Sequence, residues 1–244
     1  MTNAKEYLEF LIKDPNVLNI YKFGSQVYGT ARPDSDTDYV VITKDTDVSL
    51  HFDFQFYTKD EFQRFINNED IKALECFFLP KELRPKQDYH FMHTLDKGKL
   101  RVSISTIANG SYVKGKKKLT VLNDYDKLLA IKSLFHSLRI LDFGIQIAEL
   151  GSIVEYGRTN WLWREIYKLS EQYDHNELWD VLEARYKTVF NNMSTEFKKL
   201  CPKMLIERHT KKDELIKLFT EKGFYTKEIQ DSKLIIRILE IFDN

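Results

Sequence analysis

The chain has 244 residues, of which 43% are hydrophobic and 14% aromatic, values that exclude a disordered or low-complexity protein. Lysine plus arginine and aspartate plus glutamate both total 37, so net charge gives no support for a nucleic-acid partner, which only a local basic patch can supply. Two distant cysteines, Cys76 and Cys201, exclude a disulfide framework. With no apolar run of bilayer length and no secretory leader, we expect a cytoplasmic protein with no membrane partner.

The first predicted elements lead into a glycine-containing turn. Apolar spacing predicts a helix over 2–13, and a run of apolar and aromatic residues predicts a strand over 17–23 that enters Gly24-Ser25. A short helix is expected over 26–31. Its free N–H groups would face the turn and form a natural site for an anion.

Two aspartates begin the next predicted strand, 36–43. Strand periodicity places Asp36 and Asp38 on one face, where their carboxylates would repel unless a divalent cation lies between them. After a hairpin turn, strict alternation predicts another strand over 49–58, with Asp53 on its polar face. Antiparallel pairing of the two strands would bring Asp53 to the aspartate pair and complete a three-carboxylate cluster.

The rest of the chain carries mainly helical patterns. Thr58 and Glu61 resemble a capping box that starts a helix. Residues 80–100 are loop-rich, and 101–113 fit both a strand and a helix, of which helix is favoured. Further helices are expected over 71–78, 124–150, 160–173, 175–200, 211–222 and 225–242.

These features, taken in order, resemble those of a known family. Gly24-Ser25, ten intervening residues, Asp36-Thr37-Asp38 and the later Asp53 resemble the nucleotidyltransferase superfamily typified by DNA polymerase β. The segment from Gly29 to Asp36 most resembles the small bacterial and phage members. The resemblance spans roughly residues 17–80. It implies an α+β fold, with a nucleotidyltransferase catalytic domain (a small mixed sheet flanked by helices) over 1–120 and an α-helical domain over 121–244.

The resemblance also implies a role for each motif residue. Asp36 and Asp38 would ligate metal ions, Asp53 would be the third carboxylate, nearest the acceptor, and Gly24 and Ser25 would hold the β- and γ-phosphates of an NTP. Mg²⁺ is the expected metal, with Mn²⁺ as the alternative, because Mg²⁺ prefers oxygen ligands and keeps several waters. A plain turn followed by a strand is the competing interpretation, and the order of the elements favours the catalytic one.

Basic residues of the second half are candidates for the opposite wall of the site. Lys132, His136 and Arg139 are spaced to share one helix face. That face either meets solvent or turns across the cleft towards the nucleotide, and helical domains of this superfamily often supply such cations. The lysine run over 114–118 is interpreted as a solvated loop, although a contact with a nucleic-acid backbone would also suit it.

The predicted function is transfer of a nucleoside monophosphate from an NTP to an acceptor, with release of pyrophosphate. Three acceptors stay open: an RNA 3′ end such as that of a tRNA, a protein side-chain hydroxyl, and a small molecule such as an antibiotic. The competing class is a non-catalytic module that uses the same fold to bind a nucleotide or a partner.

Overall fold

The computed structural model describes residues 4–33, 35–45 and 53–202, and the described chain up to Pro202 belongs to one compact unit. The helices predicted over 211–222 and 225–242 lie outside the described residues. Cys76 and Cys201 are both buried free thiols. Within the described chain, no helix combines the length and apolar character needed to cross a bilayer.

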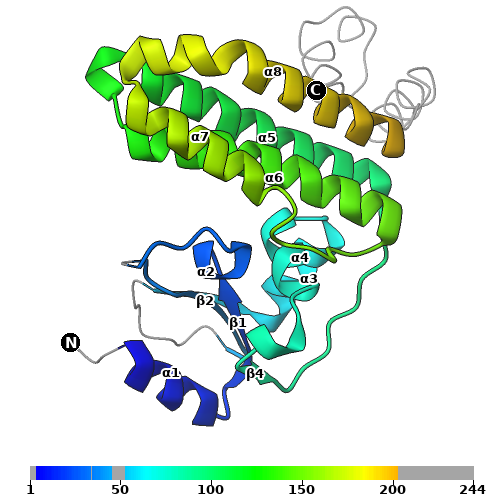
Figure 1. Ribbon diagram of the computed structural model, residues 1–244. Helices are drawn as coiled ribbons and strands as arrows, with labels where there is room; N and C mark the ends of the chain where they lie inside the picture. The colour runs from blue at the N-terminus through cyan, green and yellow to red at the C-terminus, as the bar shows by residue number, and fades with distance from the viewer. Residues whose placement is uncertain (1–3, 34, 46–52, 203–244) are drawn as a thin grey trace, which may run out of the picture. The chain divides into compact units, whose positions relative to one another are not determined.

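A four-stranded mixed sheet forms the centre of the N-terminal half (Figure 1). Its strands are β1 (Val17–Phe23), β2 (Asp38–Thr43), β3 (Phe54–Thr58) and β4 (Lys86–Gln87), in the order β3-β2-β1-β4. β1 runs antiparallel to both β2 and β4, whereas β2 and β3 are parallel. The predicted combination of a small mixed sheet with helices, and hence the α+β class, is confirmed.

The expected antiparallel pairing of the second and third strands is wrong. Tyr39 pairs with Phe54 and Thr43 with Thr58, so both strands run in the same direction. The chain must therefore return to the starting end of β2 before β3 begins, and a direct hairpin cannot do this. Alternation of apolar and polar residues reports a half-buried strand but carries no information on its direction. β3 also occupies only the second half of the predicted 49–58, and residues 46–52 lie outside the described part.

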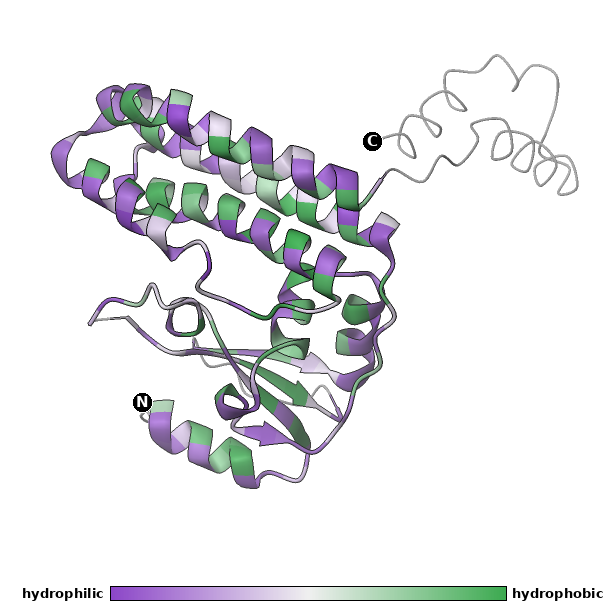
Figure 2. Ribbon diagram, turned by 45° about the vertical axis from the view of Figure 1, so that its right-hand side comes forward, coloured by the Kyte–Doolittle hydropathy of each residue, from purple (hydrophilic) through white to green (hydrophobic). Residues whose placement is uncertain are grey.

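Both faces of the sheet are covered, which explains why its central strands are apolar on both sides (Figure 2). Ile20 and Val41 point to one face and pack with Leu11 of the first helix. Val40 and Ile42 point to the other face and belong to the larger core. The helices of this half are α1 (Ala4–Lys13), α2 (Ser25–Tyr28), α3 (Lys59–Asn67) and α4 (Ile71–Phe77).

Side-chain caps fix where α3 and α4 begin. The Thr58 hydroxyl accepts the backbone N–H of Glu61, and the Glu61 carboxylate accepts that of Thr58, which confirms the predicted capping box. The Asp70 carboxylate accepts the N–H groups of Lys72 and Ala73 and so starts α4 beside the sheet.

The short turn η1 (Lys81–Leu83) precedes β4, and the short turn η2 (Leu122–Asp124) lies in the second half of the chain. Four long helices make up most of the described part of that second half, up to Pro202. They are α5 (Lys97–Thr120), α6 (Lys127–Leu150), α7 (Asn160–Gln172) and α8 (His175–Leu200). α6 packs against the other three and is buried on all sides over much of its length (Figure 1). Such burial is the behaviour of a central helix that is apolar around its circumference.

The sequence reasoning placed α5 only in part. Helix was correctly favoured over strand for 101–113, but α5 continues through 114–118, so the prediction of a loop there is wrong. The lysines are accommodated because Gly115 lets α5 approach Leu134 closely, while Lys114 and Lys117 stay exposed. The predicted boundary between 1–120 and 121–244 falls between α5 and α6, which pack against each other.

Candidate active site

Gly24 and Asp38 are in close contact at the end of the first hairpin of the sheet. Phe23 and Asp38 are cross-strand partners at the last position of β1 and the first of β2. Gly24 has a φ of 80°, and a Cβ built there would lie 2.5 Å from Oδ2 of Asp38. Both the backbone conformation and the space therefore require glycine. The Gly24 turn and the Asp38 carboxylate therefore form one packed unit.

Asp53 comes to Asp38 through the register of the parallel strands. Phe54 pairs with Tyr39, so the residues that precede this pair, Asp53 and Asp38, lie at the same edge of the sheet. The Tyr39 N–H donates to the Asp53 carbonyl oxygen over 2.8 Å, which fixes this edge. Asp36 precedes β2 and is exposed, so the strand starts two residues later than predicted.

The Asp38 carboxylate is partly buried and lies near two other negative charges. The pKa of Asp38 is raised, first by desolvation and then by the charges of Asp53 and Asp36, while the ammonium group of Lys72 opposes the shift. The three carboxylates therefore interact through space. In the ranges described, no three His, Cys, Asp or Glu side chains converge into a metal-binding group by themselves. The donor set fits Mg²⁺ nevertheless, because this ion is usually held by one or two carboxylates together with waters and substrate phosphates.

The helix after the turn is shorter than predicted. α2 has four residues, starts at Ser25 and ends where Gly29 adopts a φ of 71°. The N–H of Thr30 donates to the Ser25 carbonyl oxygen over 3.0 Å and closes this single turn of helix. Ser25 lies next to Gly24 and is half-buried, so it belongs to the same corner of the sheet as Asp38.

Comparison with known families matches residues 5–84 to the family described as polymerase beta, nucleotidyltransferase. Residues 5–84 form a domain of this family. The predicted resemblance over roughly 17–80 is thereby confirmed, and the matched range also takes in nearly all of α1. Neither the curated proteins nor the solved structures gave a match. Helices α5–α8 lie outside the matched range.

A cavity of about 370 Å³ lies on the sheet face of the nucleotidyltransferase domain. Its lining includes one residue from each of three strands, two polar residues of α4 and one residue of α6: Phe23, Val40, Tyr57, Lys72, Glu75 and His136. Val40 lies two residues beyond Asp38 on the same strand face, although the residues that line the cavity include none of the three aspartates. Its walls are mainly apolar, and Asp70, Lys72 and Glu75 add charged groups on one side.

Lys72 is a site residue of the nucleotidyltransferase domain that the sequence reasoning missed. Its ammonium group lies 5.4 Å from the ring centroid of Phe23 and 3.3 Å from the Tyr57 hydroxyl oxygen. It also donates to the side-chain carbonyl of Gln55. This is the cation that acts on Asp38. One clue was present: Lys72 and Glu75 are polar residues three apart in an otherwise apolar short helix.

The three predicted basic residues of α6 have different environments. Lys132 is exposed, His136 lines the cavity, and Arg139 is only 7% exposed. Burial, together with the positive charges of Arg139 and Lys114, lowers the pKa of His136 to about 3, so its imidazole is neutral at physiological pH. The Nη2 atom of Arg139 lies 2.7 Å from Nδ1 of His136. The guanidinium carbon of Arg139 lies 3.5 Å from the ring centroid of Tyr28. Arg139 therefore contacts the nucleotidyltransferase domain through an aromatic ring.

Proposed function

We propose that the protein is a metal-dependent enzyme that transfers a nucleoside monophosphate from an NTP to an acceptor hydroxyl or phosphate and releases pyrophosphate. The observation that carries the proposal is the packed unit of Gly24 and Asp38, with the charges of Asp36 and Asp53 beside it, inside a domain of the polymerase beta, nucleotidyltransferase family. A nucleotidyltransferase-type activity is what this family assignment supports in general.

The carboxylates are proposed to hold the metal and the acceptor. Asp36 and Asp38 would ligate Mg²⁺ or Mn²⁺, and the ion when bound would stabilise charge on the attacking and leaving oxygens. In the reaction an acceptor oxygen bonds to the α-phosphorus, the bond from that phosphorus to the bridging oxygen breaks, and pyrophosphate leaves with the electron pair. Asp53 is proposed to accept the acceptor proton before it passes to solvent, or to join the metal set.

The phosphates are proposed to lie against the glycine turn. Gly24 brings the backbone close to the carboxylates, and Ser25 adds a hydroxyl and a backbone donor for the β- and γ-phosphates. Lys72 is proposed to offset the negative charge that accumulates between Asp38 and the phosphates, because its ammonium group already acts on that carboxylate.

An RNA 3′ end is the first proposed acceptor, and the lysines of α5 are the basic groups that would serve it. Lys117 and Lys118 are both paired with Asp124, and Lys116 lies over the Trp179 ring, which reduces the charge they offer to a backbone. The largely apolar cavity of about 370 Å³ favours a second acceptor class, a small molecule.

Two measurements test the proposal. The full-length chain is incubated with Mg²⁺ and each NTP labelled at the α-phosphate, together with RNA, protein and small-molecule acceptors, and label transfer and pyrophosphate release are followed. Transfer to one acceptor class supports the proposal and identifies that class. Calorimetric titration of NTPs with and without Mg²⁺ separates the alternative: metal-independent binding without any transfer would indicate a non-catalytic binding module.

A further inference from the structure

Tyr28 is buried at the end of the very short helix that follows the glycine turn. Its side chain is only 4% exposed, although the next residue, Gly29, ends the helix. The hydroxyl donates to the carboxylate of Glu75 on α4. The backbone N–H of Tyr28 donates to the Gly24 carbonyl oxygen over 3.2 Å, which joins Tyr28 to the glycine turn within this four-residue helix.

The helical half of the chain contacts the same tyrosine from two helices. From α6, the Arg139 guanidinium lies 3.5 Å from the Tyr28 ring centroid, and the Phe143 ring lies 6.2 Å from it. From α7, the Asn160 side-chain amide donates to the Tyr28 carbonyl oxygen over 2.7 Å. Three helices therefore fix one residue of α2, through its hydroxyl, its ring and its backbone.

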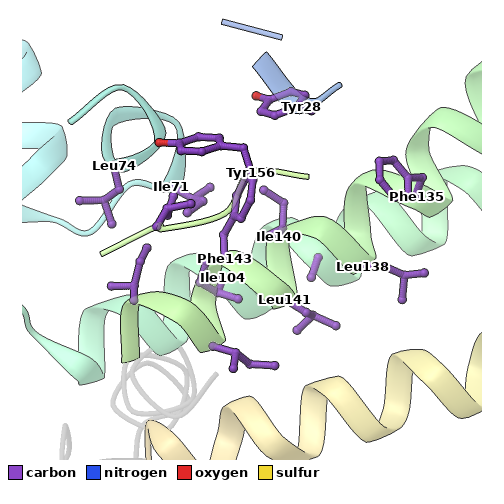
Figure 3. Packing of buried hydrophobic residues seen from close by; sticks show 14 of the residues in the cluster. Tyr28, Ile71, Leu74, Ile104, Phe135, Leu138, Ile140, Leu141, Phe143 and Tyr156 are labelled. Atoms are coloured by element: carbon purple, nitrogen blue, oxygen red, sulfur yellow. The ribbon is translucent and has the colours of Figure 1, made fainter. Parts of the chain in front are cut away.

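Glu75 is the polar anchor of this arrangement. It is 3% exposed, and its backbone carbonyl accepts the Tyr156 hydroxyl over 2.6 Å. Figure 3 shows Tyr156 between α6 and the helix that carries Ile71 and Leu74. Burying a carboxyl group is costly unless it is hydrogen-bonded, so the bond from Tyr28 satisfies a group that would otherwise destabilise the core.

Several charged and titratable groups surround Glu75. Burial raises its pKa to about 7, while the Arg139 charge, the Tyr28 hydrogen bond and the Lys72 charge act in the opposite direction and the Asp70 charge adds to the rise. The buried hydroxyl of Tyr156 and the thiol of Cys76 also lie within electrostatic reach of its charge. Burial thus favours the neutral form of Glu75, and in either protonation form a carboxyl oxygen can accept the tyrosine hydroxyl.

We propose that Tyr28 and Glu75 are positioning residues that hold the Gly24-Ser25 turn in register with Asp38, so that the helical half sets the affinity of the site for the nucleotide triphosphate. The proposal rests on the proposed function, because it assigns the phosphates to that turn. The turn tolerates little movement, since an added Cβ at Gly24 would already lie 2.5 Å from the Asp38 carboxylate oxygen.

The test compares three variants at this junction by calorimetric titration with Mg²⁺ and an NTP and by steady-state transfer kinetics. Tyr28→Phe keeps the ring under Arg139 but removes the hydroxyl, and we expect Kd and KM for the NTP to rise about tenfold. Glu75→Gln keeps an acceptor oxygen and should retain both constants within about twofold, whereas Glu75→Ala should match Tyr28→Phe. Tyr156→Phe is the matched control, because it loses one hydroxyl bond to the same residue without touching α2.

Each alternative outcome has a distinct meaning. Equal Kd and KM in wild type and Tyr28→Phe would overturn the positioning role. So would a loss of kcat in Glu75→Gln at unchanged Kd, because that pattern assigns Glu75 to proton transfer. An equal rise of Kd and KM in Tyr156→Phe would mean that loss of any hydrogen bond at this junction weakens NTP binding. That result would also overturn the proposal. Absence of any NTP binding by the wild-type chain would instead refute the proposed function.

Discussion

Replacement of Gly24 by alanine separates the geometry of the turn from ordinary backbone strain. With a φ of 80° and a ψ of −156°, Gly24 has a backbone conformation that is essentially restricted to glycine, so an alanine there costs about 1–3 kcal/mol. The new Cβ would also lie 2.5 Å from Oδ2 of Asp38. Ordinary contact begins near 3.4 Å, so the carboxylate must move by roughly an ångström. A displacement of this size at a reacting centre costs about 100-fold in rate.

Gly151→Ala is the matched control for this variant. Gly151 also has a positive φ, 74°, but with a ψ of 5° it is in the left-handed helical region. No described atom lies within 4 Å of its Cβ position, and it ends α6 far along the chain from the carboxylates. Chemical denaturation should therefore show a loss of about 1–2 kcal/mol for Gly151→Ala and about 1–3 kcal/mol for Gly24→Ala, while only Gly24→Ala loses about 100-fold in label transfer. Equal activities of the two variants would refute the close contact between the turn and Asp38.

Three further substitutions test other parts of the structure. Burial raises the folded-state pKa of Glu75 from 4.5 to about 7. Its contribution to the free energy of unfolding is therefore fully present below pH 4.5 and is lost as the pH rises through 7. In wild type, this loss should lower the free energy of unfolding by about 3 kcal/mol between pH 4.5 and pH 7, and Glu75→Gln should abolish that part of the pH dependence. Urea unfolding at each pH measures it, and parallel pH profiles of wild type and variant would contradict the prediction. Lys72→Met should lower the rate constant of transfer by about 100-fold, and an unchanged rate would exclude its charge from the reaction. Gly144→Ala brings a Cβ within 2.9 Å of Phe197 and should destabilise the chain by about 1–3 kcal/mol, whereas the unobstructed Gly110→Ala should not.

The sequence was sufficient for those parts of the site that lie close together along the chain. Gly24, Ser25 and Asp38 lie within one strand-turn-strand unit, and local patterns locate such units well. Asp53 was placed beside Asp38 even though the assumed strand direction was wrong. The parallel register also sets Phe54 next to Tyr39, so the position of Asp53 did not depend on the direction.

Contacts between distant segments were beyond sequence reasoning. The short helix with Lys72 and Glu75 was predicted, but its placement against the sheet follows from tertiary packing and not from its own periodicity. Arg139 was selected as a cation for the nucleotide, whereas in the structure its guanidinium lies over the Tyr28 ring. The lysine run was assigned to a loop because charge density favours solvent, while helix packing through Gly115 outweighed that preference.

The most direct test of the account compares wild type with Asp36→Asn and Asp38→Asn in transfer of the α-phosphate label from an NTP in the presence of Mg²⁺. Asparagine keeps the size of each side chain and removes its charge, so the fold is retained and the metal-binding charge is lost. We predict that both variants remain folded by circular dichroism and lose transfer together with pyrophosphate release. Wild-type transfer rates in both folded variants would contradict the assignment of these carboxylates to the reaction.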